Sequence, residues 1–364
     1  MLNPNKIFNF YYAWWKNIDK FILFLILSLF LLGLFFSLVS TSIIASDKLN
    51  TNTYYFFIKH MFFIFLGIFI LITFSAIDQN KLFNISQYLF LISFIFLALV
   101  PFIGVEVKGS MRWIDLPIIP RFQPIEILKP FLIIMIATFF TLNNQKHLYL
   151  KYLFSFLLIL PILLFLISQP DLGQTILIVL TWFSLIFVSG INLLFFITFF
   201  ALTFSILIYL IIYVPKFEYI KNRLISFIDP NTGNNYQSER ASEAISNGGF
   251  FGQGIGEGTL NSKVPEAHTD YIISVISEEF GVIIVLAIII IFLVLFYNIL
   301  KKVNYENDDK VKLILVGTAS IILFQTFIHI GVNIRLLPTT GMTLPFLSYG
   351  GSSIISTSII SGII

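Results

Sequence analysis

The sequence contains no cysteine and little charge. Its 364 residues include no Cys, and Asp, Glu, Lys and Arg together make up only 11% of them. Without Cys, the chain cannot form disulfides, thiolate metal sites or a cysteine nucleophile, although the cellular compartment stays open. The net charge of +3 is small and scattered, so we expect no nucleic-acid partner. The sequence also lacks a Walker-type phosphate loop, which argues against a reaction driven by bound ATP.

Apolar residues dominate instead. Hydrophobic residues make up 57% of the chain, with 43 Phe among them, and the mean hydropathy is +0.93, a composition that soluble domains do not reach. A membrane-spanning helix needs about 20 apolar residues. Such stretches begin near Phe21, Met61, Ile85, Pro124, Leu150, Gln174, Ile191, Tyr271, Leu313 and Ser348. The sequence therefore predicts an all-α integral membrane protein with about ten transmembrane helices, in a single polytopic domain over residues 1–364.

Two long polar stretches interrupt the predicted helices, at Val105–Gln123 and Pro215–Asp270. If the N-terminus is cytoplasmic, most lysines of the short loops lie on that side, and Lys48, Lys59 and Arg335 lie on the other. Because Lys and Arg in short loops favour the cytoplasm, we expect both termini there and residues 215–270 as one large extracytoplasmic loop between helices 7 and 8. The first span is longer than a signal-peptide core, so it should stay uncleaved.

Four predicted helices begin with polar motifs on this outer side. The motifs read "QPIEILKP", "QPDLGQ", "PEAHTD" and "SYGGSS". Pro with an acid in the first turn is typical of a helix start, and exposed amides at such starts attract anions. Each motif alone could be an interfacial cap, and small residues such as those of "SYGGSS" also serve close helix packing. Four of them on one face indicate an outer site.

Several charged residues have both a functional and a structural interpretation. Glu126 and Lys129 are three residues apart, so they share a helix face and can pair inside the membrane, either as a structural ion pair or within a substrate cavity. Arg112 and Trp113 are each typical of an interfacial anchor, but with the neighbouring Lys108 and Arg121 they favour a pocket for a pyrophosphate or a sugar. Asp171 could simply cap its helix.

The region before and within the eighth span has further candidates. Glu278 and Glu279 lie beyond the helix start, where we expect at least one to meet a cation or a cavity water. The motif "YQSERASEAISNGGFFGQGIGEG" predicts a short amphipathic helix followed by a glycine-rich turn that could cradle a phosphate or gate the site. His329 is more typical of a packing histidine than of a ligand.

Taken together, these motifs resemble the SEDS (shape, elongation, division and sporulation) peptidoglycan polymerases. The resemblance rests on "GSMRWIDL", "QPIEILKP", "QPDLGQ", "YQSERASEAISNGGFFGQGIGEG", "PEAHTDYIISVISEEFG" and "LPTTGMTLPFLSYGGSS", in this order over nearly the whole chain. Details of "GEG", "PEAHTD" and "TGMTLPF" favour the division branch over the elongation branch. The resemblance implies a multi-pass protein of the bacterial inner membrane, at the division septum, that polymerises lipid II on the extracytoplasmic side. It also implies a class B penicillin-binding transpeptidase and other divisome membrane proteins as partners.

The resemblance assigns roles to residues as well. The family's catalytic candidate corresponds to Asp270, and its functional acid and lysine correspond to Glu126 and Lys129. Ile125 stands where the family usually has Ser, Ile58 and Lys59 replace a more basic pair, and the chain ends at Ile364 without a basic tail, which weakens the expectation of cytoplasmic regulators.

A polyprenyl-pyrophosphate donor arrives activated, so the reaction needs cations for the leaving group and one base for the acceptor hydroxyl. We therefore expect Asp270 to act as general base, although Thr269 or Asp270 could instead cap the following helix, with His268 and Glu266 shaping the site. The resemblance is compatible with a divalent cation such as Mg²⁺ at the pyrophosphate but does not require a cofactor. The expected substrate-binding residues are Lys108, Arg112, Trp113, Glu126, Lys129, Asp171, Arg223, Gln237, His268, Ser348 and Ser352.

Two other functions fit the same spans. A flippase of the lipid-linked precursor could use Glu126 and Lys129 along its path and would need no outer base. A membrane scaffold that only recruits the transpeptidase would tolerate neutralisation of the motif residues without loss of polymerisation.

Overall fold

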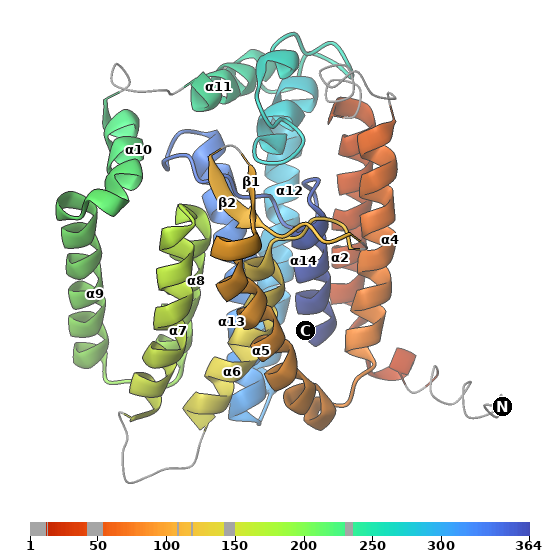
Figure 1. Ribbon diagram of the computed structural model, residues 1–364. Helices are drawn as coiled ribbons and strands as arrows, with labels where there is room; N and C mark the ends of the chain where they lie inside the picture. The colour runs from red at the N-terminus through yellow and green to blue at the C-terminus, as the bar shows by residue number, and fades with distance from the viewer. Residues whose placement is uncertain are drawn as a thin grey trace.

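Long apolar helices form most of the protein (Figure 1). The computed structural model describes residues 12, 14–41, 54–107, 109–117, 119–141, 150–229 and 236–364. Within these ranges, eight helices are long and apolar enough to cross a membrane, which confirms the predicted all-helical, multi-pass class. They are α2 (Lys20–Phe36), α4 (Tyr55–Ser75), α5 (Gln79–Ile103), α6 (Pro124–Thr141), α7 (Leu150–Ser168), α9 (Leu193–Tyr213), α12 (Ile272–Tyr305) and α13 (Asp309–Asn333). A short π-helix, Ser37–Thr41, continues α2.

Two shorter apolar helices, α8 (Leu172–Val188) and α14 (Gly351–Ile363), lie where two further spans were predicted. The count of ten transmembrane helices stays a prediction. The largest differences in a helix start are at α4, which begins six residues before Met61, and at α5, which begins six residues before Ile85. The first turns of α4 include Lys59 and His60, and the first turn of α5 includes Asn80 and Lys81, so neither start lies in an apolar run.

The first polar stretch forms a small hairpin that the all-α prediction omitted. Strands β1 (Val105–Val107) and β2 (Ser110–Trp113) pair antiparallel. Gly109 has a φ of +76° at their turn, a conformation that suits glycine. Strands of three and four residues are too short to give a recognisable alternating pattern, so the sequence alone did not reveal them.

The second polar stretch forms four short helices. They are η2 (Pro215–Phe217), α10 (Glu218–Ile228), α11 (Tyr236–Gly248) and η3 (Asn261–Lys263). The helix α11 is the predicted amphipathic helix of this region. The helices α10 and α11 lie at the same end of the bundle as β1 and β2 (Figure 1), and we call this the hairpin end.

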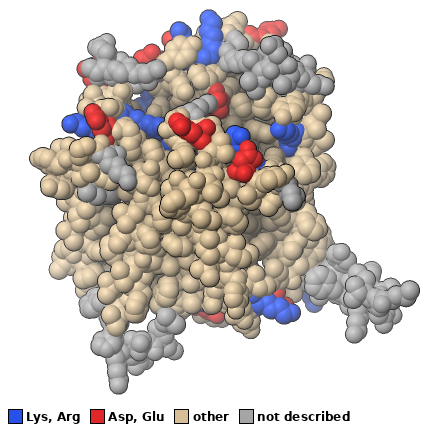
Figure 2. All heavy atoms as spheres, viewed as in Figure 1, with Lys and Arg blue, Asp and Glu red and all other residues tan. Residues whose placement is uncertain are grey.

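The surface is divided into charged ends and an apolar belt. Figure 2 shows Lys, Arg, Asp and Glu gathered near the two ends, with a broad belt free of them on the face in view. Large apolar side chains are exposed along the helices, among them Leu31, Phe65, Phe69 and Leu194. Exposed apolar surface on this scale is what a lipid-facing protein presents.

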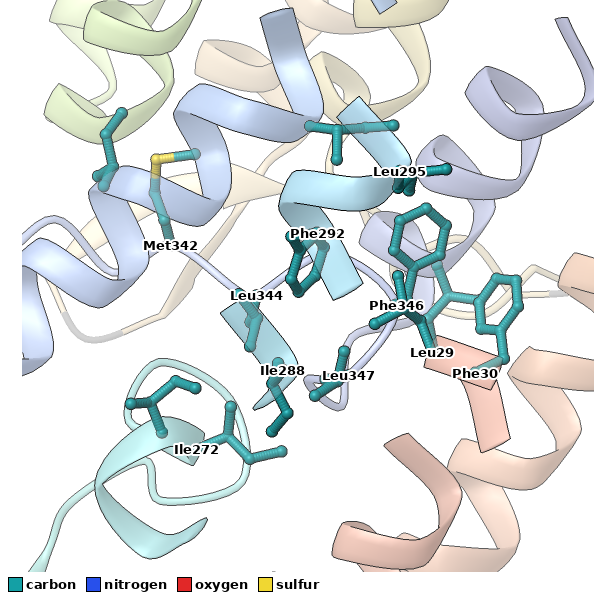
Figure 3. Packing of buried hydrophobic residues seen from close by; sticks show 14 of the residues in the cluster. Leu29, Phe30, Ile272, Ile288, Phe292, Leu295, Met342, Leu344, Phe346 and Leu347 are labelled. Carbon is teal, nitrogen blue, oxygen red and sulfur yellow. The ribbon is translucent and has the colours of Figure 1, made fainter. Parts of the chain in front are cut away.

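The turn before α14 is anchored in the apolar core. Phe346 packs edge-to-face against Phe30 of α2, with ring centroids 5.2 Å apart, and also contacts Phe292 of α12 (Figure 3). Leu344 and Leu347 are buried beside it. Aromatic burial of this kind contributes strongly to packing, so the turn has a fixed position relative to α2 and α12.

The helix α12 is interrupted at Gly281, and the glycine-rich turn fills the interruption. Gly281 has φ 81° and ψ 169°. Around it, Val282 N donates to Gly249 O (3.0 Å) and Gln253 N donates to Glu278 O (2.8 Å). A Cβ at Gly252 or Gly281 would overlap backbone atoms of the opposite segment. The glycines therefore permit close backbone packing, and the amides of Gln253 and Gly254 donate to carbonyls of α12 in this structure.

The two acids of α12 also bind this loop. Glu278 accepts hydrogen bonds from Asn247 Nδ2 (2.9 Å) and Leu260 N (2.9 Å), and Glu279 accepts one from Asn261 Nδ2 (2.9 Å). From the sequence we expected at least one of them to meet a cation or a cavity water. Amide donors of the loop bind both of them instead. Amide groups bind buried carboxylates because they donate directly to the oxygens, and Glu278 Oε2 is left without a hydrogen-bond partner among the described residues.

Candidate functional site

Glu126 and Lys129 form a buried ion pair at the start of α6. Lys129 Nζ lies 2.8 Å from Glu126 Oε2, and the two side chains are 0% and 5% exposed. The pairing predicted from their three-residue spacing is therefore present. A buried pair requires further hydrogen bonds to offset the desolvation of its charges.

Two glutamines supply those hydrogen bonds. Gln174 Nε2 of α8 donates to Glu126 Oε1, and Lys129 Nζ donates to Gln325 Oε1 of α13 at 3.2 Å. Gln325 Nε2 in turn donates to the carbonyl of Thr343 at 3.0 Å. The ion pair thus connects α6, α8 and α13 to the loop between α13 and α14, residues 334–350, which we call the α13–α14 loop.

A second polar cluster surrounds Asp171. This residue is the N-cap of α8 and accepts from Gln174 N (3.4 Å), as the capping interpretation predicted. It also accepts from Gln123 Nε2 at 2.7 Å, and its Oδ2 lies 3.9 Å from Arg112 Nε. Burial raises the pKa of the Asp171 carboxyl, and the Arg112 guanidinium acts in the opposite direction.

Arg112 is held by the turn before α8. Its Nε donates to the carbonyl of Gln169 at 3.0 Å, and its Nη2 donates to the carbonyl of Pro170. These bonds use donors that the sequence-based interpretation assigned to a pyrophosphate. Nearby, Arg121 pairs with Asp115 at 3.0 Å on the surface.

The α13–α14 loop and the "PEAHTD" segment are hydrogen-bonded to each other. Ser348 Oγ donates to the carbonyl of Thr269 (2.7 Å) and accepts from Leu344 N (2.9 Å). Tyr349 N donates to the carbonyl of His268 (3.0 Å). Ser348 therefore fixes the residue before Asp270 relative to the start of α14.

Asp270 lies against the same loop. Its carbonyl accepts from Asn333 Nδ2 at 3.0 Å, and a Cβ built on Gly341 would lie 3.5 Å from Asp270 Oδ2. The N-cap of α12 is Tyr271, and no side-chain cap hydrogen bond forms there. The structure thus places the N-cap at Tyr271 and not at Thr269 or Asp270, the residues that the capping alternative named.

Arg223 connects the neighbourhood of Asp270 with that of Asp171. Its Nη1 donates to the carbonyl of Thr339 at 3.2 Å. Burial lowers the pKa of Arg223, and the like charge of Arg112 acts in the same direction. Burial, together with the Asp270 carboxylate, raises the pKa of the Tyr271 phenol, whereas Arg223 lowers it. Arg112, Arg223 and Asp171 therefore influence one another at the hairpin end, and Tyr271 is affected by both Asp270 and Arg223.

The loops of this site contain unusual backbone conformations. Glu266, Arg335 and Phe346 have φ values of 54°, 57° and 67°, in the left-handed region that favours glycine. Such conformations cost free energy and persist only where surrounding contacts hold them, often at functional sites.

An apolar groove of about 280 Å³ opens beside the polar clusters. Its lining includes Phe63 of α4, Leu89 and Ile92 of α5, and Ser352 at the start of α14. Ser352 Oγ accepts a hydrogen bond from Gln123 N at 2.9 Å, so one residue borders both the groove and the Asp171 cluster.

The structure brings together most of the predicted site residues, but not all of them. Gln237 is exposed on α11, and Trp113 is half-buried in β2. Lys108 lies outside the described residues. His329 donates from Nδ1 to the carbonyl of Met342 at 2.7 Å, as a packing histidine does.

Sequence reasoning missed the polar partners of the predicted residues. Gln123 and Gln174 stand inside two of the quoted motifs, and their positions beside Pro and Asp could have marked them. Thr343 likewise stands inside the quoted motif "LPTTGMTLPFLSYGGSS", whereas Gln325 and Asn333 lie outside every quoted motif, and their role depends on tertiary contacts.

The donor set gives no protein-only metal site in the described part of the chain, where no group of three or more His, Asp or Glu side chains is placed to hold an ion. Magnesium often takes one or two carboxylates and completes its coordination with substrate phosphates.

These features define a multi-pass membrane protein with a recessed polar site and an adjoining apolar groove at one end. Residues 20–364 match the family model described as "Cell cycle protein", which covers FtsW, RodA and SpoVE. The chain belongs to this family.

Three comparisons illustrate the relationship. A Coxiella burnetii protein named "Probable peptidoglycan glycosyltransferase FtsW" is 34% identical over 95% of this chain and 95% of its own length. A Caulobacter vibrioides protein of the same name is 29% identical over 96% and 88%. Among solved structures, a chain from a peptidoglycan synthase complex that coordinates polymerization and crosslinking has a TM-score of 0.77, with 25% identity over 95% of this chain and 96% of that one.

Proposed function

We propose that this chain is a peptidoglycan glycosyltransferase that polymerises lipid II at the outer face of the bacterial inner membrane during cell division. The names of its relatives support the activity. Three observations support the site: Asp270 lies beside Gly341 of the α13–α14 loop, Arg223 donates to Thr339 of the same loop, and the apolar groove reaches the start of α14. The hairpin end is then the extracytoplasmic end.

In the proposed reaction, the acceptor sugar's hydroxyl oxygen attacks the anomeric carbon of the donor. The new glycosidic bond forms as the bond from that carbon to the pyrophosphate oxygen breaks, and polyprenyl pyrophosphate leaves as an anion. Asp270 takes the proton of the attacking hydroxyl, as a general base. In this proposal, cations of the arginine cluster stabilise the charge that develops on the leaving group.

The groove beside Ser352 suits the lipid part of the donor. Its lining is almost entirely apolar, and it meets the polar clusters at Ser352 and Gln123. A polyprenyl chain in the groove would place its pyrophosphate at this boundary. A divalent cation would be held there by the pyrophosphate together with a carboxylate, and no step depends on it.

The decisive experiment replaces Asp270 by Asn. Asp270→Asn keeps the size of the side chain and removes its basicity, so the protein should fold while polymerisation of lipid II falls by about 10² to 10⁴. Asp115→Asn is the matched control, because Asp115 is an exposed carboxylate paired with Arg121 at the same end. If Asp270→Asn retains activity within about tenfold of the wild type, the general-base assignment is wrong.

A flippase remains the second candidate function. The buried Glu126–Lys129 pair lies within the membrane-spanning region, where ionisable residues often mark a transport path. Purified protein in liposomes that receive outward-facing lipid II separates the two functions. A polymerase forms glycan strands from this substrate, whereas a flippase leaves it unpolymerised.

We further propose a class B penicillin-binding transpeptidase as partner, along with other membrane proteins of the division machinery. The similarity to a chain of a peptidoglycan synthase complex supports this. Reconstitution with and without a transpeptidase tests it, and equal polymerisation rates in the two would show that the partner is dispensable.

A further inference from the structure

A polar pocket lies at the hairpin end between α10 and the α13–α14 loop, apart from the groove described above. Its volume is about 200 Å³. Asn222, Arg223 and Ser226 of α10 form one wall, and Arg335 and Thr339 of the loop form the opposite wall. The pocket thus brings together two guanidinium groups from distant parts of the sequence.

The charges in this pocket are unbalanced. Among the described residues, no Asp or Glu lines it, whereas both arginines do. Within the described ranges, no hydrogen bond or ion pair involves the guanidinium of Arg335. Arg223 is largely buried, and the like charge of Arg112 disfavours its protonated form. An anion in the pocket would relieve this repulsion and accept hydrogen bonds from both guanidinium groups.

The backbone at Arg335 gives independent support. Its φ of 57° is a conformation that glycine adopts without strain and arginine does not. A strained residue that also directs a cation into a pocket is more consistent with a binding role than with a need for turn geometry.

The surroundings indicate that the anion belongs to a lipid. Leu336, next to Arg335, is 66% exposed, and Ile228, next to the lining residue Phe227, is 79% exposed. Exposed apolar side chains beside a cationic pocket are typical of the headgroup level of a membrane, where basic pockets hold lipid phosphates.

We propose that the pocket between Arg223 and Arg335 binds the phosphate or pyrophosphate headgroup of a membrane lipid. Two sources share this chemistry. One is the pyrophosphate of a second lipid-linked substrate molecule, and this assignment rests on the proposed function. The other is an anionic phospholipid, which would anchor α10 to the α13–α14 loop whatever the reaction.

The test uses the full-length protein in lipid nanodiscs and three variants. Arg335→Gly removes the guanidinium and suits the left-handed backbone, so folding should be preserved, and thermal unfolding checks this. Arg335→Lys keeps the charge. Arg240→Gln is the control, because Arg240 is a surface arginine of α11 that pairs with Glu243 outside the pocket.

Binding of polyprenyl pyrophosphate and of phosphatidylglycerol is measured separately for each protein. We expect Arg335→Gly to weaken binding of at least one lipid by about tenfold or more, the loss expected for a hydrogen bond to a charged group. Arg335→Lys should retain much of the affinity, and Arg240→Gln should match the wild type. A loss confined to polyprenyl pyrophosphate identifies the substrate as the source, and a loss of phosphatidylglycerol binding identifies the phospholipid.

The outcome that overturns the proposal is equal binding of both lipids by the wild type and Arg335→Gly. Failure of the proposed function gives a different result. If the wild type forms no glycan from lipid II but binds either lipid through Arg335, the pocket assignment stands and the glycosyltransferase assignment falls.

Discussion

The buried Glu126–Lys129 pair allows a quantitative prediction. Lys129 is fully buried, and its ammonium group contacts Glu126 at 2.8 Å and Gln325 at 3.2 Å. In Lys129→Met the Glu126 carboxylate keeps only the amide of Gln174 among these partners. In Glu126→Gln the ammonium keeps only Gln325. Because each single change leaves a buried charge without its counterion, each should reduce the free energy of unfolding by about 3 to 5 kcal/mol.

The double variant, with both substitutions, has no buried charge at these two positions. It should therefore recover much of the loss, although the oxygen of Gln325 loses a donor at a cost of about 1 to 3 kcal/mol. Equilibrium unfolding in mixed micelles gives the four free energies of a double-mutant cycle. We expect a coupling energy of about 2 kcal/mol or more between the two positions.

A matched control exists in the same chain. Lys81 and Asp78 have the same three-residue spacing and lie 3.1 Å apart, but their side chains are 73% and 75% exposed. Breaking this pair should cost less than about 1 kcal/mol. Additive effects at Glu126 and Lys129, like those expected of the exposed control, would refute the electrostatic reasoning. A stable double variant that no longer polymerises lipid II would place the pair at the substrate, and a fully active one would make it purely structural.

Three further predictions concern topology, the glycine loop and the turn before α14. The protein has no native Cys, so single cysteines can report which side of the membrane a residue occupies. A cysteine at Lys263 should react with an impermeant thiol reagent in intact cells, while one at Asn307 should stay protected. The reverse pattern would invert the orientation. Gly252→Ala should lower the thermal unfolding temperature more than Gly256→Ala. Both glycines have a positive φ, 82° and 75°, but only Gly252 faces the backbone of Glu279. Equal losses would show that backbone strain alone determines the effect. Ser348→Ala removes the hydrogen bond from Ser348 to the carbonyl of Thr269, so it should lower kcat at least tenfold with little change in expression. An unchanged kcat would exclude this positioning role of Ser348.

The helices of this protein were predictable because each depends on its own sequence. A run of about 20 apolar residues specifies a span wherever its neighbours lie, and the Asp171 cap involves only residues of one turn. The pairing of Glu126 and Lys129 also follows from spacing along a single helix.

The partners of these residues were not predictable in the same way. Gln325 contacts Lys129 across 196 positions of sequence, and no pattern near Gln325 predicts this contact. The glycine-rich turn has the composition of a phosphate loop, yet its amides bind the interrupted helix α12. A glycine-rich composition indicates that the backbone can approach another group closely. The tertiary fold determines whether that group is a ligand or another segment of the chain.

Arg335 illustrates the same limit. In the sequence it is one of the few cations on the outer side and was counted only for topology. In the structure it lines the same pocket as Arg223, more than a hundred positions away, and no carboxylate is among the described residues of that lining. Charge balance is a property of the assembled pocket, so the imbalance that indicates an anion site becomes visible only after folding.

The α13–α14 loop explains how one site can combine residues from so many elements. Phe346 anchors the loop in the apolar core, and the polar residues on either side of it reach outward to the site. Thr339 accepts from Arg223, Gly341 lies against Asp270, and Thr343 accepts from the glutamine that binds Lys129. A loop that is fixed at its centre and bonded along its length holds Asp270, Arg223 and the ion pair in one geometry. The proposed glycosyl transfer would require such a geometry, because a general base acts only within hydrogen-bonding distance of the proton it removes.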